Sequence, residues 1–280
     1  MCKIEEFDFL DANFIGQVSD FAKAEPFQLF YLYNAINMVN HEGMDFYDAF
    51  ILTNSNCKII GLCIDGGYYF YGQNWTETEL EIIRRRANFN TFPNGFHFVG
   101  TNSLINDIFK GVEIKTVDFK DRYFYKIDSI TVTSYTSPHI ITEPNESDIE
   151  ELAIITQESH KEEYKELSQR TLDEFVFQVR ELISNSDIFI SRNNKEIIGF
   201  CTAMYTKSDS PMIGTLFIKE EYRNKGIGKA LLRFVTKKLM MEKANSCYLV
   251  TERNNVSANK VIESIGFIKI YEHMDKIIIK

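Results

Sequence analysis

Residues 213–239 read IGTLFIKEEYRNKGIGKALLRFVTKKL, and this stretch decides the fold class of the C-terminal half. It begins with a short apolar run over 213–218, which predicts a buried strand, and continues through a polar turn over 220–225. Apolar residues then recur at the i, i+4, i+8 spacing of a helix, at Leu231, Val235 and Leu239. The order of these signals predicts a strand, a loop and a helix.

The loop in this stretch is suited to binding an anion. Gly226 and Gly228 let the backbone approach a ligand closely, and the following helix adds the positive end of its dipole. No acidic residue lies between 223 and 238, where six bases lie: Arg223, Lys225, Lys229, Arg233, Lys237 and Lys238. A solvated basic helix face remains the alternative for the charges alone. The glycine spacing matches neither a P-loop nor a dinucleotide-binding fingerprint. The junction therefore predicts a phosphate site of another kind.

A second ordered block follows the first. Residues 247–267 read CYLVTERNNVSANKVIESIGF and predict a strand and then a helix that starts at Asn255 and ends at Gly266. Ala258, Val261, Ile262 and Ile265 form the apolar stripe of that helix.

The chain divides near its middle. Two of the five prolines and a cluster of Ser and Thr lie in 129–146, which is the composition of a loop or boundary. Ser147 and Glu150 then form an S-x-x-E capping box that predicts the start of a helix. We therefore predict an N-terminal α/β domain over residues 1–136 and a C-terminal domain over residues 137–280.

A weak internal repeat links the two halves. Residues 50–63 read FILTNSNCKIIGLC and residues 188–201 read IFISRNNKEIIGFC. Each stretch predicts a β-hairpin with a polar turn. Chance is the alternative over so short a match; a true duplication would give both halves one architecture.

Composition limits the classes of function. The 280 residues are 44% hydrophobic and 25% charged, and 40 acidic against 31 basic residues give a net charge of −9, which argues against wrapping nucleic acid. No window approaches the roughly 20 apolar residues of a membrane helix, and the N-terminus does not resemble a signal peptide. The five cysteines form no CxxC pair, so free thiols are expected rather than a zinc site or disulfides. We expect a cytoplasmic monomer or homodimer without metal, nucleic-acid or membrane partners.

The pattern R-x-x-G-x-G after a strand, here Arg223, Gly226 and Gly228, together with the block 247–267, resembles the GCN5-related N-acetyltransferase (GNAT) superfamily. The resemblance covers residues 137–280. It implies an α/β (α+β) fold of the acyl-CoA N-acyltransferase type, with a mixed, mostly antiparallel central sheet flanked by helices. If the hairpin repeat is real, the fold occurs in tandem and the N-terminal half is a degenerate copy that shapes the acceptor pocket.

The resemblance also implies a cofactor site for acetyl-CoA. Main-chain groups of the strand would pair with the pantetheine arm, at Leu216, Phe217 and Ile218. Arg223 and the amides of the loop would hold the pyrophosphate, at Asn224, Lys225, Gly226, Ile227, Gly228 and Lys229. The next helix would contribute Asn255 and Asn259; for both, helix capping or a solvated face is the alternative.

The catalytic residues stay unassigned. Many members of the superfamily carry a tyrosine near the cofactor sulfur, and that position is Ile262 here, which cannot donate a proton. A thiol of reference pKa about 8.5 is a fair leaving group without an acid. Glu158, His160 and Glu252 are candidate bases, and for each a solvated surface role is the simpler interpretation.

The resemblance therefore implies an acyltransferase: an acetyl-CoA-dependent N-acetyltransferase acting on the primary amine of a small molecule or a protein. A non-catalytic acyl-CoA-binding or sensing module is the alternative, which Ile262 favours. A transferase that uses aminoacyl-tRNA is a further alternative, which the net charge of −9 disfavours.

Overall fold

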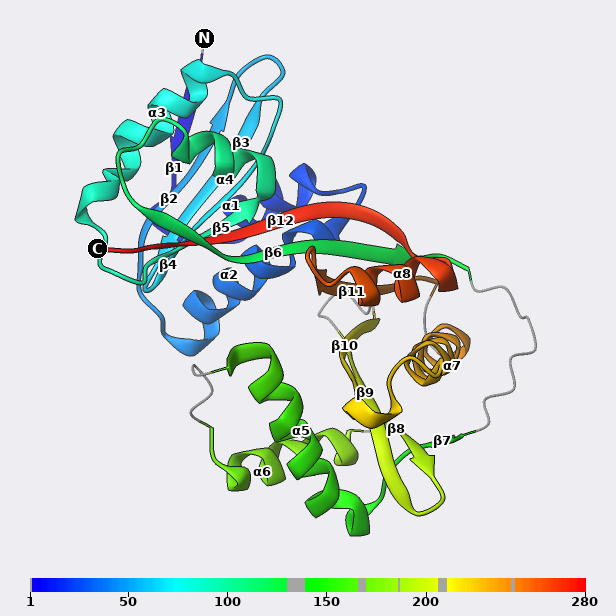
Figure 1. Ribbon diagram of the computed structural model, residues 1–280. Coiled ribbons are helices and arrows are strands. Elements are labelled where there is room, and N and C mark those ends of the chain that lie inside the picture. The colour runs from blue at the N-terminus through cyan, green and yellow to red at the C-terminus, as the bar shows by residue number, and fades with distance from the viewer. Residues whose placement is uncertain (1, 130–138, 166–169, 186, 206–210, 243–244) are drawn as a thin grey trace. The chain divides into compact units, whose positions relative to one another are not determined.

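The computed structural model describes residues 2–129, 139–165, 170–185, 187–205, 211–242 and 245–280 (Figure 1). They form two compact units. The first consists of Met1–Phe124, Glu252–Asn254 and Ile270–Lys280, and the second of Tyr125–Thr251 and Asn255–Lys269. The predicted boundary between residues 136 and 137 lies outside the described residues. The units also differ from a linear division, because the C-terminal strand belongs to the first of them from Ile270 on.

The first unit is a sheet between two layers of helices. Its strands follow the order β1-β2-β3-β4-β5-β12-β6, and β4 and β5 run parallel while β1–β2, β2–β3, β3–β4 and β5–β12 run antiparallel. The elements are β1 (Lys3–Glu6), α1 (Ala12–Phe21), η1 (Pro26–Leu29), α2 (Phe30–Glu42), β2 (Phe46–Thr53), β3 (Lys58–Ile64), β4 (Gly67–Gln73), α3 (Glu77–Ala87), η2 (Phe89–Thr91), β5 (His97–Thr101), α4 (Asn102–Phe109), β6 (Thr116–Ile127) and β12 (Ile268–Ile278).

The first unit has a hydrophobic core on each face of its sheet, and alternate residues of a strand contribute to each core. Phe50 and Leu52 of β2 pack with α3 and α4, whereas Ala49 and Ile51 pack with α1 and α2. Successive side chains of a strand point to opposite faces, so a strand buried on both faces needs apolar residues at every position. This is why residues 49–52 read as a continuous apolar run.

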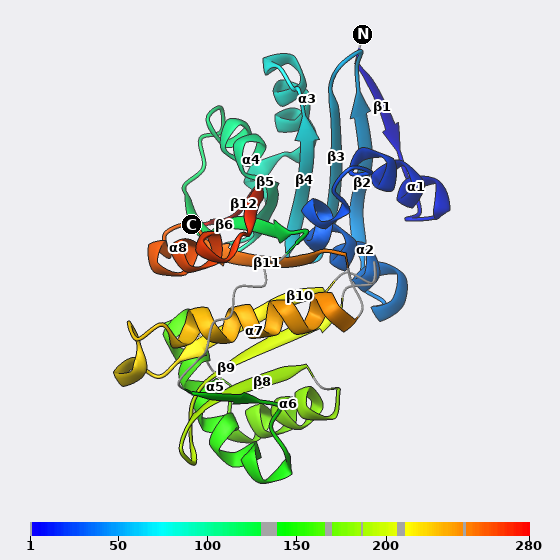
Figure 2. The same cartoon turned by 90° about the vertical axis from the view of Figure 1, so that its right-hand side faces the viewer.

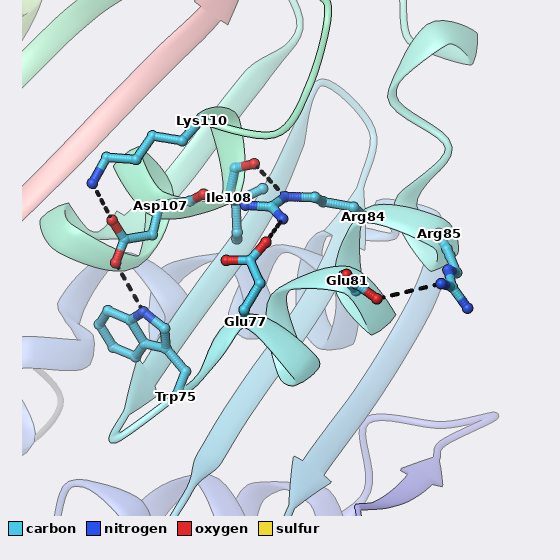
Figure 3. A network of polar contacts seen from close by, with 8 residues as sticks. All are labelled: Trp75, Glu77, Glu81, Arg84, Arg85, Asp107, Ile108 and Lys110. Carbon is cyan, nitrogen blue, oxygen red and sulfur yellow. Dashed lines mark hydrogen bonds and ion pairs between the residues drawn. The ribbon is translucent and has the colours of Figure 1, made fainter.

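Helices α3 and α4 are fastened to each other by Arg84 (Figure 3). Its Nε donates to the carbonyl oxygen of Ile108 at 2.8 Å and its guanidinium also pairs with Glu77. Asp107 of α4 accepts from Trp75 Nε1 at 3.0 Å (Figure 3). Arg84 of α3 therefore ties the two helices together through the main chain of α4.

The second unit has the same layered arrangement. Strands β11-β10-β9-β8-β7 follow one another, and β10–β11 is parallel while β9–β10, β8–β9 and β7–β8 are antiparallel. Helices α5 and α6 cover one face of the sheet, and α7 packs on β8, β9 and β10 (Figure 2). The elements are β7 (Ile140–Thr142), η3 (Glu146–Asp148), α5 (Ile149–Tyr164), α6 (Leu172–Ser184), β8 (Ile188–Asn193), β9 (Glu196–Tyr205), β10 (Pro211–Ile218), η5 (Glu220–Tyr222), α7 (Ile227–Glu242), β11 (Cys247–Glu252) and α8 (Val256–Ile265).

Most local predictions are confirmed. Both predicted hairpins are present as β2–β3 and β8–β9, with Phe50 opposite Gly61 in the first and Ser191 opposite Gly199 in the second. Each unit places a helix between two parallel strands: α3 between β4 and β5, and α7 between β10 and β11. The predicted mixed, mostly antiparallel sheet flanked by helices is therefore correct.

The predicted capping box at Ser147 and Glu150 is wrong, because the observed box begins two residues earlier. The box is formed by Asn145, whose side chain accepts from Ser147 N at 2.9 Å, and Asp148, which accepts from Asn145 N at 2.9 Å. A 3-10 turn over these residues precedes α5. An asparagine accepts backbone hydrogen bonds as well as a serine does, so the earlier residue starts the helix.

All five cysteines carry free thiols, as expected; Cys2 is partly exposed and the other four are buried. No helix in the described ranges is both long enough and apolar enough to cross a membrane.

Candidate functional site

The site predicted from the sequence lies entirely within the second unit, where β10 and β11 part. The parallel register of these strands joins Met212 to Tyr248 and Ile213 to Leu249. Beyond Ile213, β10 bends. The part of β10 that follows is therefore the part that can offer main-chain groups to a ligand.

The bend is a β-bulge. Against β9, the register shifts between Ile213 and Leu216, so that Gly214 and Thr215 lie together opposite Thr202. In a bulge, the extra residue on one strand has no partner on the neighbouring strand. It bends the bulged strand and increases the local twist. Thr215 N donates to Thr202 Oγ1 at 2.8 Å, which holds the bulge in place.

After the bulge, the residues predicted to hold the pantetheine arm continue along β9. Leu216, Phe217 and Ile218 pair in antiparallel register with Cys201, Phe200 and Gly199. The residues of β10 that pair with β11 are Met212 and Ile213, which precede this segment. The segment therefore pairs with β9 along one edge, and its other edge faces away from β9. An extended chain with amide groups can add to such an edge as a further strand does.

The loop before α7 turns through two left-handed residues. Asn224 has φ +60° and Gly226 has φ +79°. Glycine adopts this region freely and asparagine tolerates it better than most residues. The first helical bond of α7 runs from Ala230 N to Gly226 O at 3.0 Å. The amides of Ile227, Gly228 and Lys229 precede that bond, and they are the donors that a helix N-terminus offers to an anion.

Arg223 positions this loop. Its Nε donates to the carbonyl oxygen of Ile218 at 2.8 Å, and its Nη2 pairs with Glu162 Oε2 at 2.6 Å. The guanidinium also lies 5.4 Å from the centre of the Phe217 ring. The side chain thus joins the end of β10, the end of α5 and the loop. Glu162 was not among the predicted residues, because its partner lies far away in the sequence.

The cationic stretch predicted over residues 223–238 is present, and several of its members are committed to protein partners. Lys238 pairs with Glu143, and Lys225 Nζ donates to the carbonyl oxygen of Glu221 at 2.8 Å. Lys229 is half-buried in the first turn of α7, beside the amides of the loop. Its charge therefore lies next to the predicted phosphate site.

The two predicted asparagines have different roles in α8. Asn255 is the N-cap, and its side chain accepts from Ala258 N at 3.0 Å, so the capping alternative is the one observed. Asn259 is buried, and the hydroxyl of Tyr125 lies 3.3 Å from its Oδ1 and 3.0 Å from Glu263 Oε1. A solvated face for Asn259 is therefore wrong.

The candidate catalytic groups belong to different units and have different surroundings. Ile262 is 5% exposed and is a core residue of α8. Glu158 is exposed on α5, and Glu252 belongs to the first unit, where it pairs with Lys120 at 3.1 Å and Arg122 at 3.5 Å.

His160, the third candidate base, lies in a partly buried aromatic environment on α5. Its ring lies 4.5 Å from the ring of Tyr164 and meets Phe175 edge-on. Burial, and then the charge of Arg170, lower the pKa of His160 below its ordinary value. The imidazole is therefore neutral at neutral pH and can accept a proton.

No cluster of three or more metal-ligating side chains occurs in the part of the chain that the structure describes.

Comparison with known proteins agrees with this geometry. Residues 149–267 match the family model described as the acetyltransferase (GNAT) family. No curated protein matches the sequence.

The whole chain is similar to solved structures at low sequence identity. One is an acetyltransferase of the GNAT family from Colwellia psychrerythraea, at 13% identity and TM-score 0.58, covering 99% of this chain and 100% of that one. Another is a GCN5-related N-acetyltransferase from Sphaerobacter thermophilus, at 11% identity and TM-score 0.62, covering 98% of this chain and 94% of that one. A Drosophila protein matches at 9% identity and TM-score 0.56, with 98% of both chains covered. At these identities the likeness concerns the fold, which extends over both halves.

Proposed function

Because residues 149–267 form a domain of the acetyltransferase (GNAT) family, we propose that the chain transfers an acetyl group from acetyl-CoA to a primary amine. The acceptor is a small molecule or a protein. The observation that carries the proposal is the junction of β10 and α7. There a bent strand edge, a left-handed turn and a helix N-terminus follow one another within the second unit.

Each part of this junction suits one part of the cofactor. The amides of Ile227, Gly228 and Lys229 and the dipole of α7 favour the pyrophosphate oxygens. The edge of β10 from Leu216 to Ile218 suits the pantetheine arm, because the two amide groups of that arm can form hydrogen bonds with the main chain of a strand.

The chemistry that follows is acyl transfer. A neutral amine attacks the thioester carbonyl, the carbon–sulfur bond breaks, and the thiolate of coenzyme A leaves. Main-chain N–H groups of β10 are the kind of donor that stabilises the oxyanion formed on the way. A proton must leave the amine, and neutral His160 is a group whose protonation state suits a general base.

In this proposal the two halves have unequal roles. Residues 137–280 supply the acetyl-CoA site, and residues 1–136 are a degenerate copy of the fold that shapes the acceptor pocket. The protein acts in the cytoplasm as a monomer or homodimer.

A second candidate is a module that binds acyl-CoA without turning it over. Ile262, buried in the core of α8, favours it, because an aliphatic side chain cannot protonate the leaving thiolate. Release of free thiol from acetyl-CoA in the presence of a broad panel of amines separates the two. Turnover supports the enzyme; binding without turnover supports the module.

Isothermal titration with acetyl-CoA tests the site itself. The wild-type chain is expected to bind, and Gly228→Asp is expected to lower affinity by about a hundredfold or more, since a carboxylate would face the pyrophosphate. Gly228→Ala is the matched steric control, because a Cβ atom there would lie 3.5 Å from Ile218 Cγ1, an ordinary contact. Gly16→Asp is the charge control: position 16 is exposed on α1, and a Cβ atom there meets nothing within 4 Å.

Two results would contradict the proposal. Absence of binding by the wild-type chain below millimolar acetyl-CoA would remove the site, and unchanged affinity in Gly228→Asp would refute its placement at this loop.

A further inference from the structure

The bulge of β10 is held by a side chain of the neighbouring strand. Thr202 of β9 accepts a hydrogen bond on Oγ1 from the amide of Thr215 at 2.8 Å. Thr202 is 8% exposed, so its hydroxyl lies inside the sheet layer rather than in solvent. A valine would fill the same volume. The hydroxyl is therefore explained by the amide that it holds.

Gly214 is the second half of the same arrangement. A Cβ atom at position 214 would lie 2.5 Å from Thr202 Oγ1, while the next nearest atoms, Cβ and O of Thr202, would be at 3.7 and 3.8 Å. The hydroxyl alone thus requires glycine at this position. Thr202 and Gly214 form a matched pair: one supplies the oxygen, and the other leaves the space for it.

The position of the bulge decides what the rest of β10 presents. In a strand, a shift by one residue turns each side chain and each main-chain group to the opposite side. Because Gly214 and Thr215 together lie opposite the single residue Thr202, Leu216 pairs with Cys201 and Ile218 pairs with Gly199. Without the bond to Thr202, the extra residue could be accommodated at a different point of the strand.

We propose that Thr202 is a positioning residue for acetyl-CoA, which fixes the bulge and thereby the main-chain groups of Leu216–Ile218 that receive the pantetheine arm. This inference rests on the proposed function of the β10–α7 junction. Thr202 acts through the backbone of β10 and does not touch the reacting atoms.

Steady-state kinetics of Thr202→Val test the role. The KM for acetyl-CoA is expected to rise about fivefold, the factor that one hydrogen bond of ordinary strength is worth. The kcat at saturating acetyl-CoA is expected to change less than the KM, because the lost interaction stabilises the bound cofactor equally in the ground state and the transition state. Thr202→Ser keeps the hydroxyl and should restore the wild-type KM. Thr236→Val is the matched control, since Thr236 is fully buried in α7 and its Oγ1 donates to Leu232 O at 2.8 Å, away from the bulge.

A double variant separates positioning from stability. Gly214→Ala alone is expected to lower the melting temperature, because its methyl group collides with Thr202 Oγ1. Adding Thr202→Ala removes that oxygen and should recover much of the melting temperature. The KM for acetyl-CoA should stay raised in the double variant, because the amide of Thr215 still has no hydroxyl to hold it.

The outcomes are distinguishable. A KM unchanged in Thr202→Val, or recovered together with the melting temperature in the double variant, makes the hydroxyl purely structural and overturns the inference alone. A wild-type chain that neither binds nor turns over acetyl-CoA overturns the proposed function, and this inference with it.

Discussion

Arg223 Nε donates a hydrogen bond to the carbonyl oxygen of Ile218 at 2.8 Å, and so fastens the loop before α7 to the last residue of β10. The same guanidinium pairs with Glu162 at 2.6 Å. One side chain therefore sets the distance between the strand edge and the helix N-terminus, the two parts of the proposed site. A planar guanidinium can make both contacts at once, whereas an ammonium on a flexible stem cannot reproduce that geometry.

Arg223→Lys should consequently raise the KM for acetyl-CoA by about fivefold to tenfold, the effect of one charge-assisted contact, with a smaller effect on kcat. Initial-rate kinetics against acetyl-CoA measure this. Arg85→Lys is the control, since Arg85 is 82% exposed on α3 and makes a single 3.3 Å ion pair with Glu81. An equal effect of both substitutions would contradict the role of Arg223.

The pair of His97 and Asp275 predicts a pH dependence of stability. His97 Nδ1 lies 2.8 Å from Asp275 Oδ1, which joins β5 to β12. The hydrogen bond to Asp275 raises the pKa of His97 above its ordinary value. The protonated form is thus favoured by folding. Its contribution is fully present below about pH 6.5, the unfolded value, and is lost as pH rises through the folded pKa.

The test compares wild type with His97→Gln by urea unfolding at several pH values. The His97 side chain is 37% exposed, so solvent screens the pair and its contribution is expected to be about 0.5 kcal/mol. The excess stability of the wild type should be largest near about pH 6 and shrink toward about pH 9. An excess that grows with pH would refute the assignment.

Glu79 should be a stronger cap than Glu174, although both close a capping box with threonine. Glu79 is 2% exposed and accepts from Cys2 Sγ, from Thr76 and from Asn54 Nδ2, whereas Glu174 is exposed. The hydrogen bonds from Cys2 and Thr76 lower the pKa of Glu79 to about 2. Its contribution is therefore present above the unfolded value of about 4.3 and is lost as pH falls toward the folded one.

At pH 7, Glu79→Gln is expected to cost about 1 kcal/mol of unfolding free energy, the usual value of a helix cap. Glu174→Gln should cost less. Chemical unfolding of both variants at pH 7 and in acid measures the difference, and equal costs at pH 7 would show that burial of the box is irrelevant.

The same carboxylate predicts one acetyl-CoA per chain. Helix α3 is the counterpart of α7 between two parallel strands, but its N-terminus is closed by the box of Thr76 and Glu79. A carboxylate already at these amides repels phosphate. Titration calorimetry should give a stoichiometry near one, and Gly228→Asp should leave no tight binding. A stoichiometry of two, or residual tight binding in that variant, would place a second site in the first unit.

The local elements of this fold could be predicted from the sequence, because the patterns that indicate them lie within short stretches of the chain. Apolar spacing placed β10 and α7, and Asn255 and Gly266 marked both ends of α8. The same reasoning found the glycine loop of the proposed site. It named Asn224 as part of that loop but did not predict its left-handed backbone, which the geometry of the turn imposes.

The contacts that position the site could not be predicted in this way. Arg223 and Glu162 are joined through tertiary packing, and so are Thr202 and the amide of Thr215 across two strands. Neither pair has a local pattern that marks it. The place of β12 beside β5 is likewise a long-range pairing, and no composition signal distinguishes it from a strand of the second unit.

The strand β12 sets an order of assembly during synthesis. Its residues Ile270–Ile278 belong to the first unit, yet they are synthesised only after every residue of the second unit. Until then β5 has β4 on one side and an unpaired edge on the other, which is the kind of edge that attracts other chains. The half that is translated first is thus the half that is completed last, and a chain arrested before β12 would leave this edge of β5 unpaired and prone to aggregation.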